Sequence, residues 1–476
     1  MRIELPLYRK GYEGDSSTLN SQRCINLYPE TIEGEPDSKV GLITTDGLEF
    51  LTSIGIGPHR GVCEHNGDLY FVSGPTLYKH DTNLSVTNIG NLNTSGGFVS
   101  MASNGISGGE LIIVDGADGW IYDGSTLTAI VDADFPTSPT KVIFFDGYFI
   151  VLENNSDYFY LSAAYDGTSW SSLDKARAER DPDTLQAVAA HNRVVWLIGE
   201  HTTELWYNSG NDFPFDPIPN SIIEIGTKAP NSIAHVGDDG ILWLAHDEHG
   251  ALYVVKTDAS TVKSITPPAI VSLFESYTGI ENATAFVYRR RGHTFYVITF
   301  PDENKTWVYD LLTDAWHERE NSKHGRFEGS TYIYWEQMHL VGDFETGNLY
   351  KLLPAVYTEN SRVIRREFST NHVTDKGQLI RHNYIELEIE TGMALLSGQG
   401  SDPKITMEFS DNDGKTWSNA RTKSLGVQGD YNKLIRWTHL GTTRNRVYRF
   451  TMSDPVKYRI KALFLDTPDT KIERHA

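Results

Sequence analysis

The chain is rich in side chains capable of acid–base chemistry, with 63 Asp and Glu, 42 Lys and Arg and 16 His. A glycoside hydrolase needs two carboxylates within about 10 Å across a cleft, and so many acids supply such pairs by chance. Arg289, Arg290 and Arg291 are cations of the kind that bind a substrate carboxylate. They are adjacent along a predicted strand, so their side chains point to alternate faces and do not converge. We therefore predict no catalytic residues.

Spacing indicates neither a cofactor nor a metal site. The sequence has no GxSxG, HExxH, Walker or GxGxxG motif in a usable context. Cys24 and Cys63 form no CxxC pair and no zinc-ligand spacing. Asp411, Asn412 and Asp413 stand together, but an EF-hand loop needs ligands at alternate positions and a glutamate at the twelfth. We predict no cofactor-binding residues and no metal ligands.

Residues 410–417 (SDNDGKTW) nearly match the Asp-box pattern S-x-D-x-G-x-T-W, with Asn412 in place of the aspartate. Asp-boxes are hairpin turns in which a polar side chain bonds the turn backbone and the tryptophan packs beneath it. They are common in glycan-handling propellers, so a carbohydrate role stays open, although a rigid turn is the favoured interpretation. Residues 165–170 are a looser version of the same turn.

The elements that would position these residues follow a repeat between residues 61 and 351. Each copy has a polar turn, an apolar run, a second turn and a closing aromatic pair or Leu-Tyr. The apolar runs are residues 69–72, 111–114, 148–152, 194–198, 241–244, 295–298 and 338–341. The Gly, Asn and Asp residues of the turns accept the positive φ of tight hairpins. Closing tyrosines recur about every 40 to 55 residues, the period of propeller blades.

These patterns predict an all-β chain of three parts. Residues 1–60 form an extended N-terminal arm, and residues 61–360 form a β-propeller. The propeller has six or seven blades, because the first and last hairpins can combine in one blade. Residues 361–476 form an antiparallel β-sandwich-like domain, since apolar and polar residues alternate strictly in segments such as 384–390 and 447–452. An ordinary sandwich with repetitive hairpins is the alternative to the propeller.

Charge and hydropathy restrict the function further. The formal net charge of −21 disfavours tight nucleic-acid binding by the whole surface, because phosphate binding depends on Lys and Arg. It does not exclude a conduit that DNA slides through. The start of the sequence lacks the pattern of a secretory signal, and no apolar stretch approaches the roughly 18 residues of a membrane span. We expect synthesis in the cytoplasm and no membrane span.

Short motifs at both ends resemble a known family. They are Cys24-Ile25-Asn26-Leu27-Tyr28-Pro29-Glu30, residues 42–48 (LITTDGL), His59-Arg60-Gly61-Val62, the Asp-box, Arg436-Trp437 with Leu440-Gly441, and residues 446–450. Their order is similar to that in the packaged-DNA stabilisation proteins, the tail nozzle or hub of short-tailed double-stranded DNA phages. Asp46 departs from the family pattern, in which proline is more usual at that position.

The resemblance implies a non-enzymatic structural protein of the virion tail, made in the host cytoplasm. It implies a homo-oligomer, a hexameric ring below the portal and its adaptor protein. The ring retains packaged DNA and forms the channel for genome ejection. The other implied partners are a tail needle or plug, tailspikes or fibres, and genome DNA that passes through the lumen without specific binding. The alternative is a glycan-binding or glycan-cleaving propeller used in receptor attachment.

Overall fold

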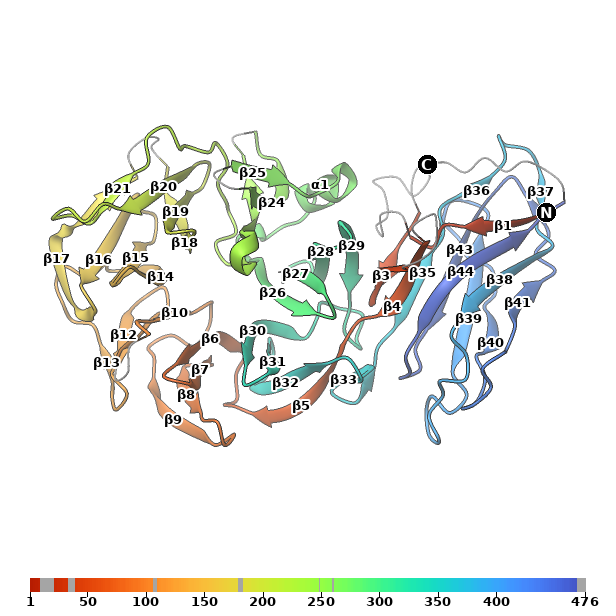
Figure 1. The fold of residues 1–476 in the computed structure, drawn as a ribbon, viewed down its shortest axis with the longest axis horizontal. Helices are drawn as coiled ribbons and strands as arrows, with labels where there is room; N and C mark the ends of the chain where they lie inside the picture. The colour runs from red at the N-terminus through yellow and green to blue at the C-terminus, as the bar shows by residue number, and fades with distance from the viewer. Residues whose placement is uncertain are drawn as a thin grey trace.

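The computed structural model describes residues 1–8, 21–32, 39–105, 109–178, 183–247, 249–258 and 261–468. Residues 9–20 and 33–38 of the predicted N-terminal arm lie outside the described residues. The described chain forms a ring of four-stranded sheets beside a sandwich of two sheets (Figure 1). This confirms the prediction of an all-β chain in which a propeller precedes a sandwich.

Seven antiparallel sheets make up the propeller, and the first four follow one another directly along the chain. Their strands are, in blade 1, β6 (His59–His65), β7 (Asp68–Ser73), β8 (Thr76–His80) and β9 (Val86–Asn91); in blade 2, β10 (Ser100–Ser103), β11 (Leu111–Val114), β12 (Gly119–Tyr122) and β13 (Leu127–Ala129); in blade 3, β14 (Pro139–Phe145), β15 (Tyr148–Glu153), β16 (Tyr158–Ala163) and β17 (Asp166–Arg177); and in blade 4, β18 (Leu185–His191), β19 (Val194–Gly199), β20 (Thr203–Asn208) and β21 (Phe215–Pro217).

The remaining three blades complete the ring. Their strands are, in blade 5, β22 (Ala234–His235), β23 (Ile241–His246), β24 (Leu252–Asp258) and β25 (Thr261–Ser264); in blade 6, β26 (Thr284–Arg290), β27 (His293–Phe300), β28 (Lys305–Asp310) and β29 (Ala315–Arg319); and in blade 7, β30 (Gly329–Trp335), β31 (Met338–Asp343), β32 (Asn348–Leu353) and β5 (Gly47–Ser53). Blades 5 and 6 also carry the helices η1 (Gly237–Asp239), α1 (Pro268–Glu275) and η2 (Ile280–Asn282). The repeats predicted from the sequence are the second and third strands of each blade.

Strand β5 resolves the question of blade number. It precedes blade 1 in the sequence but pairs antiparallel with β32, so that Glu49 lies opposite Lys351. The last hairpin therefore takes its outer strand from the N-terminal segment, and the ring closes with seven blades (Figure 1). A strand far away in sequence thus fastens the first blade to the last.

One apolar cluster fills each boundary between neighbouring blades in the described chain. The second strand of each blade supplies both of its boundaries. In β7, Leu69 and Phe71 pack against blade 7, whereas Tyr70 and Val72 pack against blade 2. A strand that is buried on both faces has an unbroken run of apolar residues in its sequence. Burying each of these large side chains contributes roughly 1.5–3 kcal/mol, so the ring is held by its blade boundaries.

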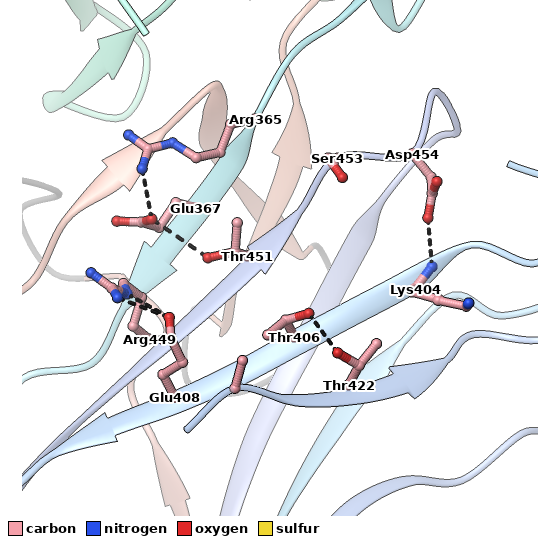
Figure 2. Close-up of a pocket in the computed structure, with 11 residues that line it drawn as sticks. Arg365, Glu367, Lys404, Thr406, Glu408, Thr422, Arg449, Thr451, Ser453 and Asp454 are labelled. Carbon is pink, nitrogen blue, oxygen red and sulfur yellow. Dashed lines mark hydrogen bonds and ion pairs between the residues drawn. The ribbon is translucent and has the colours of Figure 1, made fainter. Parts of the chain in front are cut away.

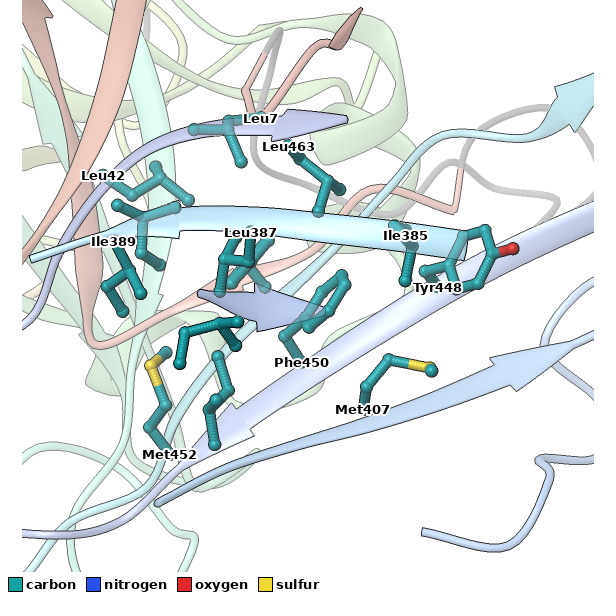
Figure 3. Packing of buried hydrophobic residues seen from close by; sticks show 14 of the residues in the cluster. Leu7, Leu42, Ile385, Leu387, Ile389, Met407, Tyr448, Phe450, Met452 and Leu463 are labelled. Atoms are coloured by element: carbon teal, nitrogen blue, oxygen red, sulfur yellow. The ribbon is translucent and has the colours of Figure 1, made fainter. Parts of the chain in front are cut away.

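Two sheets form the sandwich and enclose the largest apolar cluster, part of which is drawn in Figure 3. One sheet has β1 (Arg2–Leu5), β3 (Leu27–Ile32), β4 (Lys39–Thr44), β38 (Tyr384–Ile389), β41 (Ile435–Thr438) and β44 (Arg459–Asp466). The other has β2 (Cys24–Ile25), β35 (Arg366–Ser369), β36 (Val373–Thr374), β39 (Lys404–Ser410), β40 (Arg421–Ser424) and β43 (Asn445–Met452). Short strands β33 (Thr358–Glu359), β34 (Arg362–Val363), β37 (Ile380–Arg381) and β42 (Thr442–Thr443) flank them.

The N-terminal segment, predicted as an extended arm, is extended and paired with distant strands. Arg2 of β1 lies opposite Asp466 of β44, and Leu42 of β4 lies opposite Ile460 of the same strand. Leu5 and Leu42 are buried in the sandwich core. Strand β2 joins the domains, because it pairs parallel with β29 of blade 6 and antiparallel with β35. One continuous sheet therefore runs from the propeller into the sandwich.

Candidate functional site

Close packing explains why arginine and glycine stand at the start of blade 1. The Arg60 guanidinium is buried and donates hydrogen bonds at 2.5–2.9 Å to main-chain carbonyls of the neighbouring loops, those of Gly74, Thr94, Gly96 and Gly97. A Cβ on Gly61 would lie 2.6 Å from the carbonyl oxygen of Val99, so only glycine fits there. The Arg-Gly pair found in the sequence thus fixes the first blade against the second.

Asn26 stands where the propeller meets the sandwich. It is buried with φ 53°, a left-handed conformation that asparagine tolerates better than most residues. Its side-chain amide donates to the carbonyl of Glu320 at 3.0 Å and to that of Arg365 at 2.7 Å. Its side-chain oxygen accepts from the main-chain N–H of Glu320 at 3.1 Å. One side chain therefore bonds the last strand of blade 6 to the segment that enters the sandwich.

Charged side chains surround this junction. The Arg23 guanidinium donates to both carboxylate oxygens of Glu318, at 2.6 and 2.7 Å. Arg365 donates to Glu320 at 2.8 and 3.0 Å and lies 3.3 Å from Glu367. Burial lowers the pKa of Arg23, but the bond to Glu318 and the surrounding carboxylates outweigh it and raise that pKa. The junction is therefore a paired charge network that fixes how the domains meet.

A second charged group lies beneath strand β5. Both carboxylate oxygens of Glu359 are buried without a hydrogen-bond partner. Burial raises the pKa of Glu359 to about 8, against the opposing charge of Arg319. Nearby, a Cβ on Gly47 would lie 2.5 Å from the carbonyl oxygens of Val356 and Thr358. Only glycine fits at position 47, where the chain passes close to the segment that leads to Glu359.

The Asp-box forms the rigid turn that the sequence predicts. The main-chain N–H of Gly414 donates to the Ser410 hydroxyl at 2.9 Å, and that of Thr416 donates to the Asn412 side-chain oxygen at 2.9 Å. Asn412 therefore performs the backbone bonding expected of the aspartate. Trp417 lies under the turn and carries the Arg449 guanidinium 3.9 Å from its ring centroid. The motif also ties its hairpin to β43, because Arg446 donates to Asp411 at 2.6 and 2.7 Å and Asn445 donates to Asp413 at 2.7 Å.

The looser turn in blade 3 has the same internal bonding. The main-chain N–H of Thr168 donates to Asp166 at 2.9 Å, and the Trp170 indole donates to the carbonyl of Gly167 at 2.8 Å. Trp170 is buried and meets Phe135 edge to face, with ring centroids 4.9 Å apart. This turn locks blade 3 to the loop that leaves blade 2.

The three consecutive arginines go to three separate partners. Arg289 lies 3.0 Å from Asp239, Arg290 lies 3.4 Å from Asp46, and Arg291 donates to the carbonyl of Pro354 at 2.9 Å. Arg289 lies apart from the other two, in its pair with Asp239 of blade 5. Burial raises the pKa of Asp46, and the charges of Arg291, Arg319 and Arg290 oppose that rise, so Arg290 and Arg291 both lie near this carboxyl of the chain itself.

A polar groove of about 530 Å³ lies on the sandwich face opposite the core, over β35, β43, β39 and β40 (Figure 2). Several of its polar side chains are paired with one another. Arg449 donates to Glu408 at 2.8 Å, Arg365 pairs with Glu367, Thr406 and Thr422 share a hydrogen bond of 3.0 Å, and Asp454 accepts from the main-chain N–H of Lys404 at 2.7 Å. The arginines of the groove are therefore held by their own carboxylate partners.

A side chain bridges the hub of the propeller. The Lys141 ammonium, from the inner strand of blade 3, donates to the side-chain oxygen of Asn231 before blade 5 at 2.5 Å. It also lies 4.5 Å from the centroid of the Phe98 ring. Burial lowers the pKa of Lys141 to about 7. This contact joins the inner strand of blade 3 to the segment before blade 5.

Within the residues that the structure describes, no group of three or more His, Cys, Asp or Glu side chains is placed to hold a metal ion. Cys24 is buried and Cys63 is half-buried, and both are free thiols. No helix of the described chain is long and apolar enough to cross a membrane.

Comparisons with known proteins identify the family. A model described as the β-propeller of bacteriophage P22 Gp10 matches residues 3–357, and one described as the β-sandwich of the same protein matches residues 365–467. The chain belongs to the P22 Gp10 family. It is a structural protein of a phage tail and a component of the virion. No curated protein sequence matched the chain.

Several solved structures are similar to this Gp10-family chain. They include the Neurospora crassa Pan2 WD40 domain (TM-score 0.41, 11% identity, covering 63% of this chain and 94% of that one), a streptogramin B lyase (0.44, 10%, 64% and 96%) and YCF48 bound to D1 peptide (0.41, 10%, 68% and 98%). Their activities are not carried over to this chain.

Sequence reasoning did not find the junction residues Arg23, Glu318, Glu320 and Arg365. Glu318 lies in β29 and Glu320 follows the end of that strand, and with His317 and Arg319 they make a polar stretch that is nonetheless buried. The run His317-Glu318-Arg319-Glu320 follows the last aromatic pair of the sixth repeat, and it carries no local signal that its charges are buried.

Proposed function

We propose that this chain is the tail nozzle, or hub, that binds below the portal and its adaptor, retains the packaged DNA and forms the channel for genome ejection. The observation that carries the proposal is the match of both Gp10 domains, in order, to residues 3–357 and 365–467. Together they take up nearly the whole chain. The proposed role is structural and needs no catalysis.

Rigidity supports this role. Strand β5 closes the ring of blades, and one sheet continues through β29, β2 and β35 into the sandwich. A body of this kind offers broad fixed faces on which identical neighbours pack in a closed ring. In the proposal, the predicted domains of residues 61–360 and 361–476 are the two blocks of each subunit. Six copies form the ring, with the adaptor above, a needle or plug within, and tailspikes or fibres outside.

The proposed DNA channel is the space that the copies enclose. The hub of each propeller is bridged by Lys141 and Asn231 and does not serve as the conduit. A net charge of −21 suits a wall that repels phosphate, because DNA then slides past without being held. The idea fails if the residues that face the lumen of the assembled ring prove to be mostly Lys and Arg.

The experiment is to assemble virus particles without this chain and to count filled and empty heads by electron microscopy. The proposal predicts empty heads that regain DNA when the chain is supplied during assembly. Stable, DNA-filled particles that fail only to adsorb would contradict it and would favour receptor binding or glycan cleavage. Supplying a variant with a disrupted propeller core, such as Trp243→Asp, is the matched control for rescue by folded protein.

A further inference from the structure

One buried histidine of the propeller lies between a carboxyl of its own blade and a carboxyl of the sandwich. The Nδ1 atom of His293 lies 2.7 Å from Oδ2 of Asp310, and its Nε2 atom lies 3.2 Å from Oε2 of Glu30. His293 and Asp310 belong to the paired strands β27 and β28 of blade 6, whereas Glu30 belongs to β3 at the edge of a sandwich sheet. We call these three side chains the interdomain bridge.

Strand alternation explains why β3 faces both domains. Leu27 packs in the sandwich core, whereas Tyr28 packs in the apolar cluster between blades 6 and 7. Glu30 is two residues after Tyr28, so its side chain lies on the same face of the strand and meets blade 6 (Figure 1). Its side chain is 38% exposed, whereas that of His293 is 1% exposed. Glu30 is thus the member of the bridge that can turn towards water.

Asp310 is held inside blade 6 independently of the sandwich. Its Oδ1 atom accepts from the main-chain N–H of Leu312 at 3.1 Å, and its Oδ2 atom accepts from the Thr313 hydroxyl at 2.7 Å. The His293 ring stacks against Phe295, with ring centroids 5.5 Å apart. A buried carboxylate is costly unless hydrogen-bond donors surround it. The pair of His293 and Asp310 is therefore a fixed anchor, and the bond to the sandwich is its movable part.

The other titratable groups that pack against this imidazole, among the described residues, are neutral or already paired. Burial lowers the pKa of His317 on β29 to about 3, so this neighbour stays neutral. Tyr28 meets the imidazole edge to face, with ring centroids 5.1 Å apart, and burial raises its pKa. Arg290, which lies opposite His293 in the sheet, is 3.4 Å from Asp46. The charge of the bridge therefore depends on its own three side chains.

Protonation of His293 decides how many bonds the bridge makes. Burial lowers the pKa of His293, but the bonds to Asp310 and Glu30 and their charges outweigh it and raise that pKa above its ordinary value of 6.5. The protonated imidazole donates from both nitrogens, whereas the neutral one donates from only one. Asp310 is fully buried, so the remaining proton stays on Nδ1, and Nε2 then presents a lone pair to Glu30. The bond to Glu30 is therefore complete below pH 6.5 and is lost as pH rises through the raised pKa.

We propose that Glu30, His293 and Asp310 form a proton-dependent latch, which holds the edge strand of the sandwich to blade 6 and releases it when His293 loses a proton. Strand β2 keeps the domains connected in both states, because it pairs with β29 and with β35. The latch therefore changes how firmly the sandwich is held without separating the domains. It is a property of the single chain and does not depend on the proposed function.

Histidine titration in the full chain tests the latch directly. Exchange of the imidazole C2 hydrogen, followed by mass spectrometry, measures the pKa of individual histidines. We expect the pKa of His293 to lie above 6.5 in the native chain and to fall in Glu30→Gln, because this substitution removes one of the two negative charges. Glu345→Gln is the matched control, since Glu345 pairs with Lys323 on the propeller surface. An unchanged pKa of His293 in Glu30→Gln would overturn the proposal.

Amide hydrogen exchange of residues 27–31 then measures the release itself. Protection factors, which correct for the intrinsic pH dependence of exchange, are compared from about pH 6 to about pH 9. In the native chain we expect protection to fall about tenfold over this range, because one hydrogen bond to a charged group is lost. Glu30→Gln should keep its protection throughout, because the amide donates to the neutral imidazole and accepts from the protonated one. Glu30→Ala should have low protection at every pH.

Protection in the native chain that does not change with pH would contradict the latch. An equal fall in the native chain and in Glu30→Gln would also contradict it, by showing that a group other than the bridge responds to pH. Circular dichroism and melting temperature establish that each variant is folded, which the partial exposure of Glu30 favours.

Discussion

The propeller and the sandwich are both built from antiparallel strands, but they differ in how far apart in the sequence their paired strands lie. Blades 1 to 6 each pair strands that follow one another directly, as β6 to β9 do within residues 59–91. In the propeller only β5 comes from far away in sequence among the described strands. The sandwich is assembled from both ends of the chain, and β1 pairs with β44 across more than 450 residues.

The difference shows that the N-terminal segment is essential to both domains. Residues 27–44 supply two strands to the sandwich, and residues 47–53 supply the last strand of the propeller. Long-range pairings must repay a large loop-closure entropy before they stabilise a fold. We therefore expect each domain to depend on a few N-terminal side chains, and the following predictions test that dependence from the largest effect to the smallest.

The first prediction separates the two domains with a matched pair of substitutions. Leu42 and Leu48 are both fully buried, six residues apart, the first in the sandwich core and the second between blades 6 and 7. Each change to Ala removes buried apolar contacts and leaves a cavity, which costs about 2–5 kcal/mol of unfolding free energy. Hydrogen exchange with mass spectrometry should show Leu42→Ala deprotecting β38 and β44, and Leu48→Ala deprotecting β32 and β31.

Equal deprotection of both domains by either variant would contradict this separation and would indicate that the two domains unfold as one unit. Glu49→Ala, on the exposed face of β5, controls for a general effect of mutating this segment.

The second prediction concerns the junction. Arg23→Ala leaves the carboxylates of Glu318 and Glu320, which are both buried, short of a cation. Uncompensated buried charge is costly, and because Arg23 is itself partly exposed we expect a loss of about 1–3 kcal/mol. Denaturant unfolding followed by fluorescence measures the loss. Arg289→Ala, which removes an exposed pair with Asp239, should cost less than about 1 kcal/mol. Equal losses in the two variants would show that the junction network contributes no more than a surface ion pair.

The contrast between the domains also explains what the sequence can predict. Blades are visible because a run such as Leu69 to Val72 is unbroken and is followed by its own turn and partner strand, all within about 15 residues. The alternating strands of the sandwich, such as Tyr384–Ile389, are visible for the same local reason. Fold class and the order of the domains follow from these signals together with the family motifs.

Partners far apart in the sequence leave no local signal. Periodicity indicates that Leu42 is buried but not that its neighbours lie on β44. Periodicity also does not decide between six and seven blades, because β5 is separated from its partner β32 by almost 300 residues. Asn26 is recognisable in a motif, yet its role depends on Glu320 and Arg365. The loops of residues 390–403 and 425–434, more than 20 residues apart, likewise meet only in the folded chain, where the main-chain N–H of Gly429 donates to the carbonyl of Gly392.

The third prediction concerns Glu359, next to β5, and the pH dependence of stability that its buried carboxyl causes. The pKa of Glu359 is about 8 in the folded chain, because of burial, against 4.5 for the ordinary side chain. The native state therefore holds a proton that the unfolded state has released between these values, so stability falls as pH rises from 4.5 to 8. Glu359→Gln should remove this cost. We expect no gain at pH 4 and a gain on the order of 1–3 kcal/mol at pH 8, measured by denaturant unfolding at each pH.

Glu49→Gln, on the exposed side of the neighbouring strand, should show no such pH-dependent gain. If the gain of Glu359→Gln were the same at pH 4 and pH 8, ionisation of Glu359 would not be the source of the effect.

The last prediction compares one turn from each domain. In the sandwich the Ser410 hydroxyl is buried and accepts from the main-chain N–H of Gly414, whereas in the propeller the Asp166 carboxylate bonds Thr168 at a more exposed turn. Ser410→Ala removes the hydrogen bonds that the hydroxyl makes with both Asn412 and Gly414, whereas water can replace the bond that is lost at the exposed turn. Ser410→Ala should therefore lower unfolding free energy by about 1–2 kcal/mol and Asp166→Ala by less than about 1 kcal/mol. The reverse order, measured by thermal unfolding, would mean that the blade 3 turn stabilises the ring more than the Asp-box stabilises the sandwich. The local signal in the sequence would then be a poor guide to which turns matter, even where it locates them correctly.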